Sequence, residues 1–276
     1  MEKFDSADVF KAADTSRKLG VPYIVENCDE LNKIVADKAA KTTLLVFQVQ
    51  FPNSEMAKSE NRGQIPFHND KKTKVREHLM EFAPQAARSM LEKYDTGGIT
   101  GKTICQVSLF GCTPQMVHEG IERNGLPSLR YHKQGVREVT VVMFSDILEY
   151  MKDHSHSIPD AQDFFEGVKD LLTGLRTKED FDIYFNNGAR KIYRGVVKEG
   201  ACIYIPAGCF VVERTLGECH VYGFRTSALD PTPRALHGWN CLRTLVMERT
   251  TKNEGLVKLW SACADILKPH IEKLLV

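Results

Sequence analysis

Three arginines, Arg130, Arg137 and Arg225, lie in or beside the apolar, β-branched stretches of the sequence. A guanidinium is planar and binds a carboxylate through two parallel hydrogen bonds, so these residues are candidates for holding an acidic ligand. Arginines also occur commonly at exposed sheet edges with no ligand, which is the competing interpretation. The choice between the two depends on the strands that carry these arginines and on the side toward which they point.

Two histidine motifs have the spacing of metal ligands. His68 and Asp70 form an H-x-D string inside the polar stretch of residues 53–72. His154 and His156 form an H-x-H pair, which on a strand would place both imidazoles on one side. Both motifs lie in polar connections between predicted elements, so solvated loops are the competing interpretation.

Cys112, with His118 or His132, has the residue types of a nucleophile and its base. No set of donors that would stabilise an oxyanion accompanies them in the sequence, so a buried cysteine is the preferred interpretation. Residues 97–103 end in Gly-Lys-Thr, as a phosphate-binding loop does. The first glycine of that loop is one residue late, and a strand instead of a helix follows, so we expect no such loop here.

The composition excludes several classes of protein. The 276 residues are 42% hydrophobic and 26% charged, and a formal net charge of +1 gives no whole-chain attraction to nucleic acid. No apolar stretch approaches the roughly 20 residues of a membrane helix. Residues 1–14 are charged, so we expect no secretory signal. The eight cysteines form no C-x-x-C pair, so we expect reduced thiols in a cytoplasmic or nuclear protein.

Many short strands with flanking helices are the predicted elements. Residues 1–95 are expected to be a helical region with one strand, at residues 42–51, packed on the core. The core is residues 102–230, where an amphipathic helix at residues 159–176 interrupts the strands. Residues 231–276 are expected to be a helical C-terminal segment, with a helix at residues 255–275. The predicted strands of the core are residues 102–110, 126–131, 137–144, 183–185, 191–197, 201–205, 210–215 and 220–224.

Residues 197–213 read VKEGACIYIPAGCFVVE. Glu199 and Gly200 form a predicted tight turn, and residues 202–205 form a buried strand. Pro206 and Gly208 force a corner, because proline fixes φ and glycine permits a positive φ. This segment resembles the second conserved strand pair of Jumonji-C proteins and related cupin barrels. The resemblance implies an α+β fold, in which an antiparallel cupin-like barrel (a double-stranded β-helix) carries flanking helices.

Residues 126–144, LPSLRYHKQGVREVTVVMF, resemble the upstream half of the same barrel, in which a glycine turn and a basic residue precede a strand of valines. The family carries an H-x-D pair before that turn, and the nearest equivalent here, His118-Glu119-Gly120, lacks the aspartate. The family's distal histidine corresponds to a stretch that includes Val211. An iron site of this kind needs two imidazoles and one carboxylate. Because alternation puts Glu213 on the face of Val211, His118 and Glu213 are the metal candidates.

With both metal motifs incomplete, we expect a non-catalytic binding or structural protein that has lost its metal site and carries no cofactor. The mouth of the barrel would be lined by Arg130, His132, Glu213 and Arg225, in reach of a small acidic ligand or a peptide of a protein partner. One alternative is an Fe(II)- and 2-oxoglutarate-dependent oxygenase with a rearranged ligand set. A second is a β-rich assembly subunit, and homo-oligomerisation stays open.

The barrel strands are also expected to share a single core, because their inward-facing side chains are apolar. The predicted members of this core are Val139, Val141, Ile203, Ile205, Val211 and Phe224.

Overall fold

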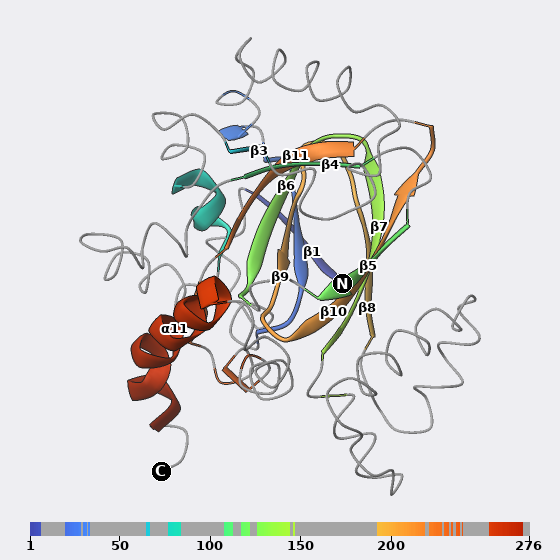
Figure 1. Ribbon diagram of the computed structural model, residues 1–276. Helices are drawn as coiled ribbons and strands as arrows, with labels where there is room; N and C mark the ends of the chain where they lie inside the picture. The colour runs from blue at the N-terminus through green and yellow to red at the C-terminus, as the bar shows by residue number, and fades with distance from the viewer. Residues whose placement is uncertain are drawn as a thin grey trace, which may run out of the picture.

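The computed structural model describes residues 1–6, 20–28, 30–31, 33, 65–66, 77–83, 108–112, 117–121, 126–143, 146, 192–218, 221–227, 229–231, 233, 236–237, 239 and 254–272. Within these ranges the chain forms the strands β1 to β11 and the helix α11 (Figure 1). The predicted strand at residues 42–51 and the predicted helix at residues 159–176 lie outside the described residues.

The described strands form two sheets. The larger sheet has the order β1-β2-β9-β6-β11-β4-β3, and the smaller has the order β5-β10-β7-β8. All pairs are antiparallel except β1 with β2. The strands are β1 (Glu2–Asp5), β2 (Tyr23–Glu26), β3 (Ile65–Pro66), β4 (Ser108–Cys112), β5 (Val117–Ile121), β6 (Ser128–Gln134), β7 (Val136–Met143), β8 (Ile192–Val197), β9 (Cys202–Ile205), β10 (Cys209–Leu216) and β11 (Val221–Ser227).

Among strands β4 to β11, the first along the chain pairs with the last, the second with the second last, and so on to the middle. β4 pairs with β11, β5 with β10, β6 with β9, and β7 with β8. The chain therefore runs out and back as one two-stranded ribbon, and successive pairs of this ribbon alternate between the larger and the smaller sheet. Among the described strands, no hydrogen-bonded pair joins one sheet to the other, so the arrangement is two facing layers.

Apolar side chains from both layers meet between the sheets and form the inner core. The larger sheet contributes Ile24, Ile203 and Ile205, and the smaller contributes Val139, Val141, Met143, Val197, Cys209 and Val211. The layers approach closely at Gly195 of β8, where an added Cβ would lie 2.7 Å from Cδ1 of Ile24. A larger residue there would have to displace the end of the Ile24 side chain, so the position favours glycine.

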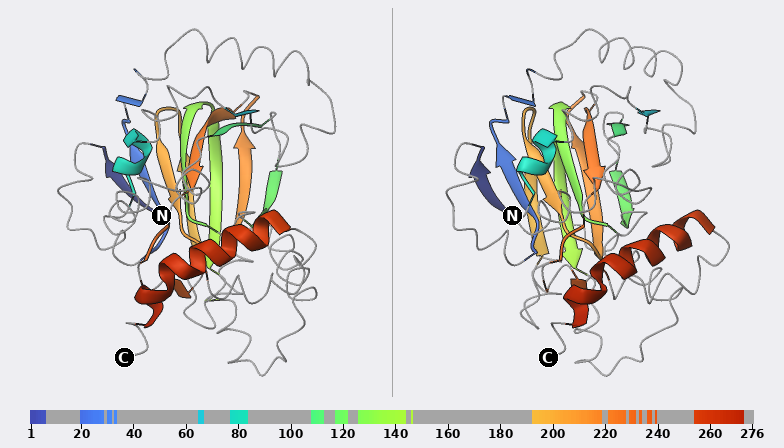
Figure 2. Two further views of the ribbon diagram at one scale, coloured as in Figure 1. Left: turned by 60° about the vertical axis from the view of Figure 1, so that its left-hand side comes forward. Right: turned by 90° about the vertical axis from the view of Figure 1, so that its left-hand side faces the viewer.

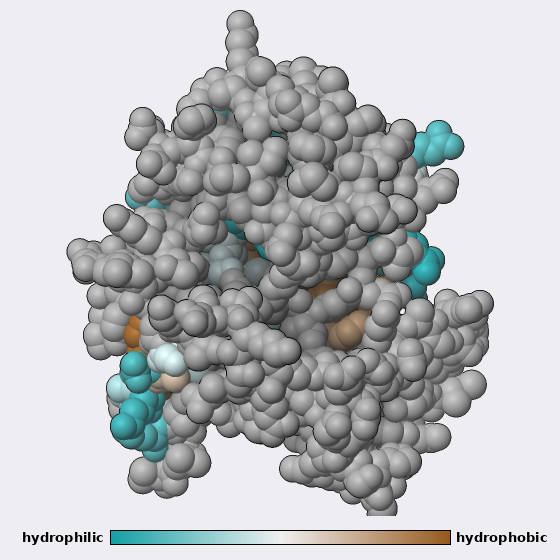
Figure 3. All heavy atoms as spheres, in the orientation of Figure 1, coloured by the Kyte–Doolittle hydropathy of each residue, from teal (hydrophilic) through white to brown (hydrophobic). Residues whose placement is uncertain are grey.

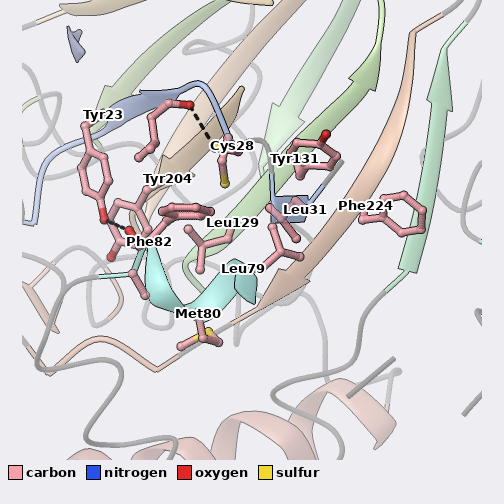
Figure 4. Packing of buried hydrophobic residues seen from close by; sticks show 13 residues of the cluster. Tyr23, Cys28, Leu31, Leu79, Met80, Phe82, Leu129, Tyr131, Tyr204 and Phe224 are labelled. Atoms are coloured by element: carbon pink, nitrogen blue, oxygen red, sulfur yellow. Dashed lines mark hydrogen bonds between the residues drawn. The ribbon is translucent and has the colours of Figure 1, made fainter. Parts of the chain in front are cut away.

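The other face of the larger sheet forms an outer core (Figure 4). Here the sheet packs against the helical segment at residues 77–81, which contributes Leu79 and Met80. Tyr23 stacks on Tyr204 with 5.0 Å between the ring centroids, and the Tyr23 hydroxyl donates a hydrogen bond to the carbonyl oxygen of Phe82 at 2.5 Å. The larger sheet is therefore covered on both faces.

Phe224 belongs to this outer core, so the prediction that it shares one core with Ile203 and Val211 is wrong. The other five predicted members do lie together in the inner core. The error arises because period-two alternation along β11 assigns Phe224 and Arg225 to opposite faces but does not say which face is inside.

Helix α11 (Glu254–Glu272) lies across one end of the strands (Figure 2). Its residues Cys263 and Leu267 are buried, and its other side is hydrophilic (Figure 3). The residues that it packs against are Leu126, Ala207, Leu229, Leu236 and Trp239. The helix agrees with the one predicted for residues 255–275. None of the described helices combines the length and the apolar character needed to cross a membrane.

The strands predicted at residues 126–131, 137–144 and 201–205 correspond to β6, β7 and β9, and Gly135 makes the turn between β6 and β7 with a φ of 84°. The sequence does not predict β1 or β2. β1 is short and polar, and β2 is an apolar run of only four residues, so neither has a period that distinguishes a strand.

Candidate functional site

Strand β6 carries two polar side chains into the space between the sheets. Leu129 and Tyr131 belong to the outer core, so Arg130 and His132, which alternate with them, face the smaller sheet. On the opposite layer, Glu213 lies two residues after Val211, which is part of the inner core. The space between the sheets therefore has an apolar end and a polar end.

Glu213 bridges two arginines at the polar end. Nη1 of Arg130 donates to Oε1 of Glu213 at 2.5 Å, and Nη1 of Arg137 donates to Oε2 at 2.9 Å. Arg130 is 5% exposed, Arg137 2% and Glu213 1%. Both carboxylate oxygens thus bind a guanidinium in a desolvated setting. The two cations and one anion leave a net charge of +1 on this triad, which we call the Arg–Glu–Arg triad.

Arg137 has donors that the triad does not use. Its Nε and Nη2 atoms are buried, and no acceptor among the described residues takes a hydrogen bond from either. Thr215, whose Oγ1 is likewise buried and without a partner among the described residues, stands directly opposite Arg137 in the pairing of β10 with β7. Residues directly opposite in an antiparallel pair project to the same face. Three donors that need an acceptor therefore share one face of the smaller sheet.

His132 and Cys112 are the other ionisable groups of the polar end. Burial and then the positive charge of Arg137 lower the pKa of His132 from its ordinary 6.5 to about 3, against the opposing effect of Glu213. Burial raises the pKa of the Cys112 thiol more than the charge of Arg137 lowers it. Both groups are therefore uncharged near neutral pH.

The structure brings together three of the four residues predicted to bind a ligand, Arg130, His132 and Glu213. The fourth, Arg225, stands opposite Arg130 in the pairing of β11 with β6 and is half-buried. Its charge reaches Cys112 along with those of the triad, which places it at the edge of the same cluster. The metal candidate His118 lies on β5 directly opposite Glu213 in the strand pairing.

Within the part of the chain that the structure describes, no group of three or more histidine, cysteine, aspartate or glutamate side chains is arranged to hold a metal ion. The H-x-D string at His68 and Asp70, the H-x-H pair at His154 and His156, and the Gly-Lys-Thr stretch of residues 97–103 lie outside the described residues.

The sequence indicates Arg137 only as one of three arginines that are candidates for holding an acidic ligand, and it does not indicate Thr215. The signal for Thr215 was present, because the alternation that gives Val211 and Glu213 one face continues to Thr215. The signal for Arg137 was weaker. Its importance comes from a contact with Glu213 that spans 76 residues of sequence, and no local pattern predicts such a contact.

No protein-family model matches the sequence, and no curated protein matches it at a significant level.

Proposed function

We propose that this protein binds a small carboxylic acid between the two layers of a cupin-like double-stranded β-helix and does not catalyse a reaction on it. The nested strand pairing supports the fold part of the proposal. A two-stranded ribbon whose pairs alternate between two four-stranded sheets is the plan of the jelly rolls, to which cupins belong. β4 to β11 follow this pairing, and β1, β2 and β3 extend the larger sheet.

The observation that supports binding of an acid is the edge of the Arg137 guanidinium formed by Nε and Nη2, for which no described residue supplies an acceptor. We call it the open edge of Arg137. A guanidinium buried with two donors unsatisfied costs free energy, because each donor has lost its hydration without gaining an acceptor. A carboxylate presents two coplanar oxygens that fit the Nε and Nη2 edge, and the Thr215 hydroxyl supplies a further donor. Binding of such a group satisfies the donors that the described residues leave without an acceptor.

The charges of the polar end favour an anion over a cation. Glu213 has both oxygens on guanidiniums, so binding a metal would break two charge-assisted hydrogen bonds beside two fixed positive charges. A non-catalytic role is supported by Cys112, whose raised pKa keeps it a protonated thiol and hence a poor nucleophile.

Isothermal titration with acetate tests the proposal, because acetate is the smallest group that can occupy the site. We expect saturable binding to the wild-type protein and at least about tenfold weaker binding to Arg137→Gln, which removes the charge and the planar edge. Arg137→Lys keeps the positive charge but lacks the planar pair of donors, so it should also bind acetate more weakly than the wild type does. The matched control is Arg214→Gln on β10, where the arginine is exposed, and this variant should bind as the wild type does. No saturable binding to a folded wild-type protein would contradict the proposal.

The oxygenase alternative has one observation in its favour, which is the alignment of His118 with Glu213 across β5 and β10. It requires tight one-to-one binding of Fe(II) that disappears in His118→Ala, together with turnover of 2-oxoglutarate. Titration with Fe(II) in the absence of oxygen therefore separates the two functions, since the acid-binding function requires no iron.

A further inference from the structure

We infer that the acid bound by this protein is a 2-hydroxy acid and that Thr215 is the residue that selects it. The inference rests on the proposed function, because the carboxylate of such an acid would occupy the open edge of Arg137. It adds a chemical class of ligand, and it assigns a role to a buried hydroxyl that the binding of a carboxylate by Arg137 does not require.

The hydroxyl of Thr215 is buried without a partner in the part of the chain that the structure describes. Thr215 is 3% exposed, and no described residue forms a hydrogen bond with its Oγ1 atom. A hydroxyl can donate one hydrogen bond and accept others, and burying it without a partner costs free energy because it has lost its hydration. Valine has nearly the same shape and would avoid this cost. The threonine therefore favours a ligand as the partner of the hydroxyl.

Thr215 and Arg137 stand directly opposite each other in the pairing of β10 with β7. Side chains in this relation project to the same face, with their Cβ atoms about 4.5–5.5 Å apart. The threonine hydroxyl is attached to Cβ and stays close to the sheet, whereas the guanidinium lies at the end of a long, unbranched side chain. The hydroxyl and the open edge are therefore two separate binding groups on one face of the smaller sheet.

A 2-hydroxy acid has one group for each of these two partners. When a carboxylate binds the open edge of Arg137 through both oxygens, the substituent nearest to those oxygens is the one on the neighbouring carbon. A hydroxyl on that carbon can accept a hydrogen bond from Thr215 or donate one to it, whereas a methyl group can do neither. A 2-hydroxy acid is therefore the smallest acid whose carboxylate and hydroxyl match Arg137 and Thr215 separately.

Glycolate and propionate test the inference, because they are monocarboxylates of nearly equal size that differ by a hydroxyl in place of a methyl group. In isothermal titration we expect the wild-type protein to bind glycolate at least about tenfold more tightly than propionate, since propionate leaves the buried hydroxyl unpaired. Thr215→Val keeps the shape of the side chain and should lose this preference. Thr215→Ser keeps the hydroxyl and should retain it.

Thr140→Val is the matched control. Thr140 is also buried and lies on β7, but it alternates with the inner-core residues Val139 and Val141, so it faces the other side of the sheet. This variant should keep the wild-type preference for glycolate.

The melting temperature without ligand gives a second readout on Thr215. Thr215→Val should be at least as stable as the wild type, because it removes a polar group that the described residues leave without a partner. A clear loss of stability would show that the hydroxyl has a partner within the protein, and this result would overturn the inference.

The outcomes separate the inference from the proposed function. If neither acetate nor glycolate binds the folded wild-type protein, the proposed function fails and the inference fails with it. If acetate binding depends on Arg137 while glycolate and propionate bind equally, the inference is wrong and the acid site stands. A preference for glycolate that persists in Thr215→Val also overturns the inference, because another residue would then recognise the hydroxyl.

Discussion

His132 shows how strongly the polar end of the inter-sheet space is desolvated. It is fully buried, and its pKa of about 3 lies well below the ordinary 6.5 of histidine, first through burial and then through Arg137. Below pH 6.5, His132 becomes protonated in the unfolded chain, whereas in the folded protein it stays neutral until the pH approaches about 3. The free energy of unfolding therefore falls as the pH falls between about 6.5 and about 3.

His132→Asn should remove this part of the pH dependence. We expect the wild-type protein to lose up to about 1.4 kcal/mol of stability for each pH unit below its unfolded-state pKa, in addition to losses from other groups. The variant should lose less over the same range. Denaturant unfolding of both proteins at about pH 7 and about pH 5 measures the difference. Identical losses in the two proteins would show that His132 is not held neutral.

Individual strands could be predicted where their neighbours along the chain decide the structure. The β6–Gly135–β7 hairpin and the β9–β10 corner follow from apolar runs interrupted by glycine and proline, and both are present. The partners of these strands could not be predicted in the same way. Arg130 and Glu213 are 83 residues apart, and alternation gives each a face without stating which two faces meet. Because alternation does not say which face of a strand lies inside, Phe224 was also assigned to the wrong core.

The contact between β8 and β2 gives a direct test of how the layers face each other. Gly195→Ala places a Cβ 2.7 Å from Cδ1 of Ile24, so the substitution should destabilise by about 1–3 kcal/mol, as overpacking does. Ile24→Val removes that Cδ1 atom. In the Ile24→Val background the same Gly195→Ala change should therefore cost clearly less.

Unfolding free energies of the four proteins in this cycle measure the coupling between the two positions. Gly217→Ala serves as a control, because nothing lies within 4 Å of its Cβ position and its positive φ of 77° is the only source of strain. Its cost should not change in the Ile24→Val background. If Ile24→Val likewise leaves the destabilisation by Gly195→Ala unchanged, the two layers do not meet at this position.

The complete ribbon, from β4 to β11, encloses two kinds of interior. One is the apolar inner core, and the other is the Arg–Glu–Arg triad with His132. A buried ion triad is weak evidence for stability, because desolvation offsets most of its attraction. The apolar core and the cover of residues 77–83 therefore account for stability, and the triad is the part of the interior on which the proposed binding depends.

The thiols of the whole chain give a test of its redox state. The five described cysteines are free: Cys28, Cys112, Cys202, Cys209 and Cys263. Since the sequence leads us to expect a reducing compartment, all eight cysteines should titrate as thiols after denaturation without reductant. Recovery of about four or fewer thiols from freshly prepared protein would contradict the expectation of a reducing compartment.

The proposed function depends on contact between an acid and the open edge of Arg137, and nuclear magnetic resonance observes that edge directly. In ¹⁵N-labelled protein, the Nε–H signal of Arg137 is identified as the one that is missing from Arg137→Lys. During a titration with acetate we expect this signal to shift saturably, as its hydrogen gains an acceptor, while the signal of exposed Arg214 stays in place. An Arg137 signal that does not move at saturating ligand would contradict the account.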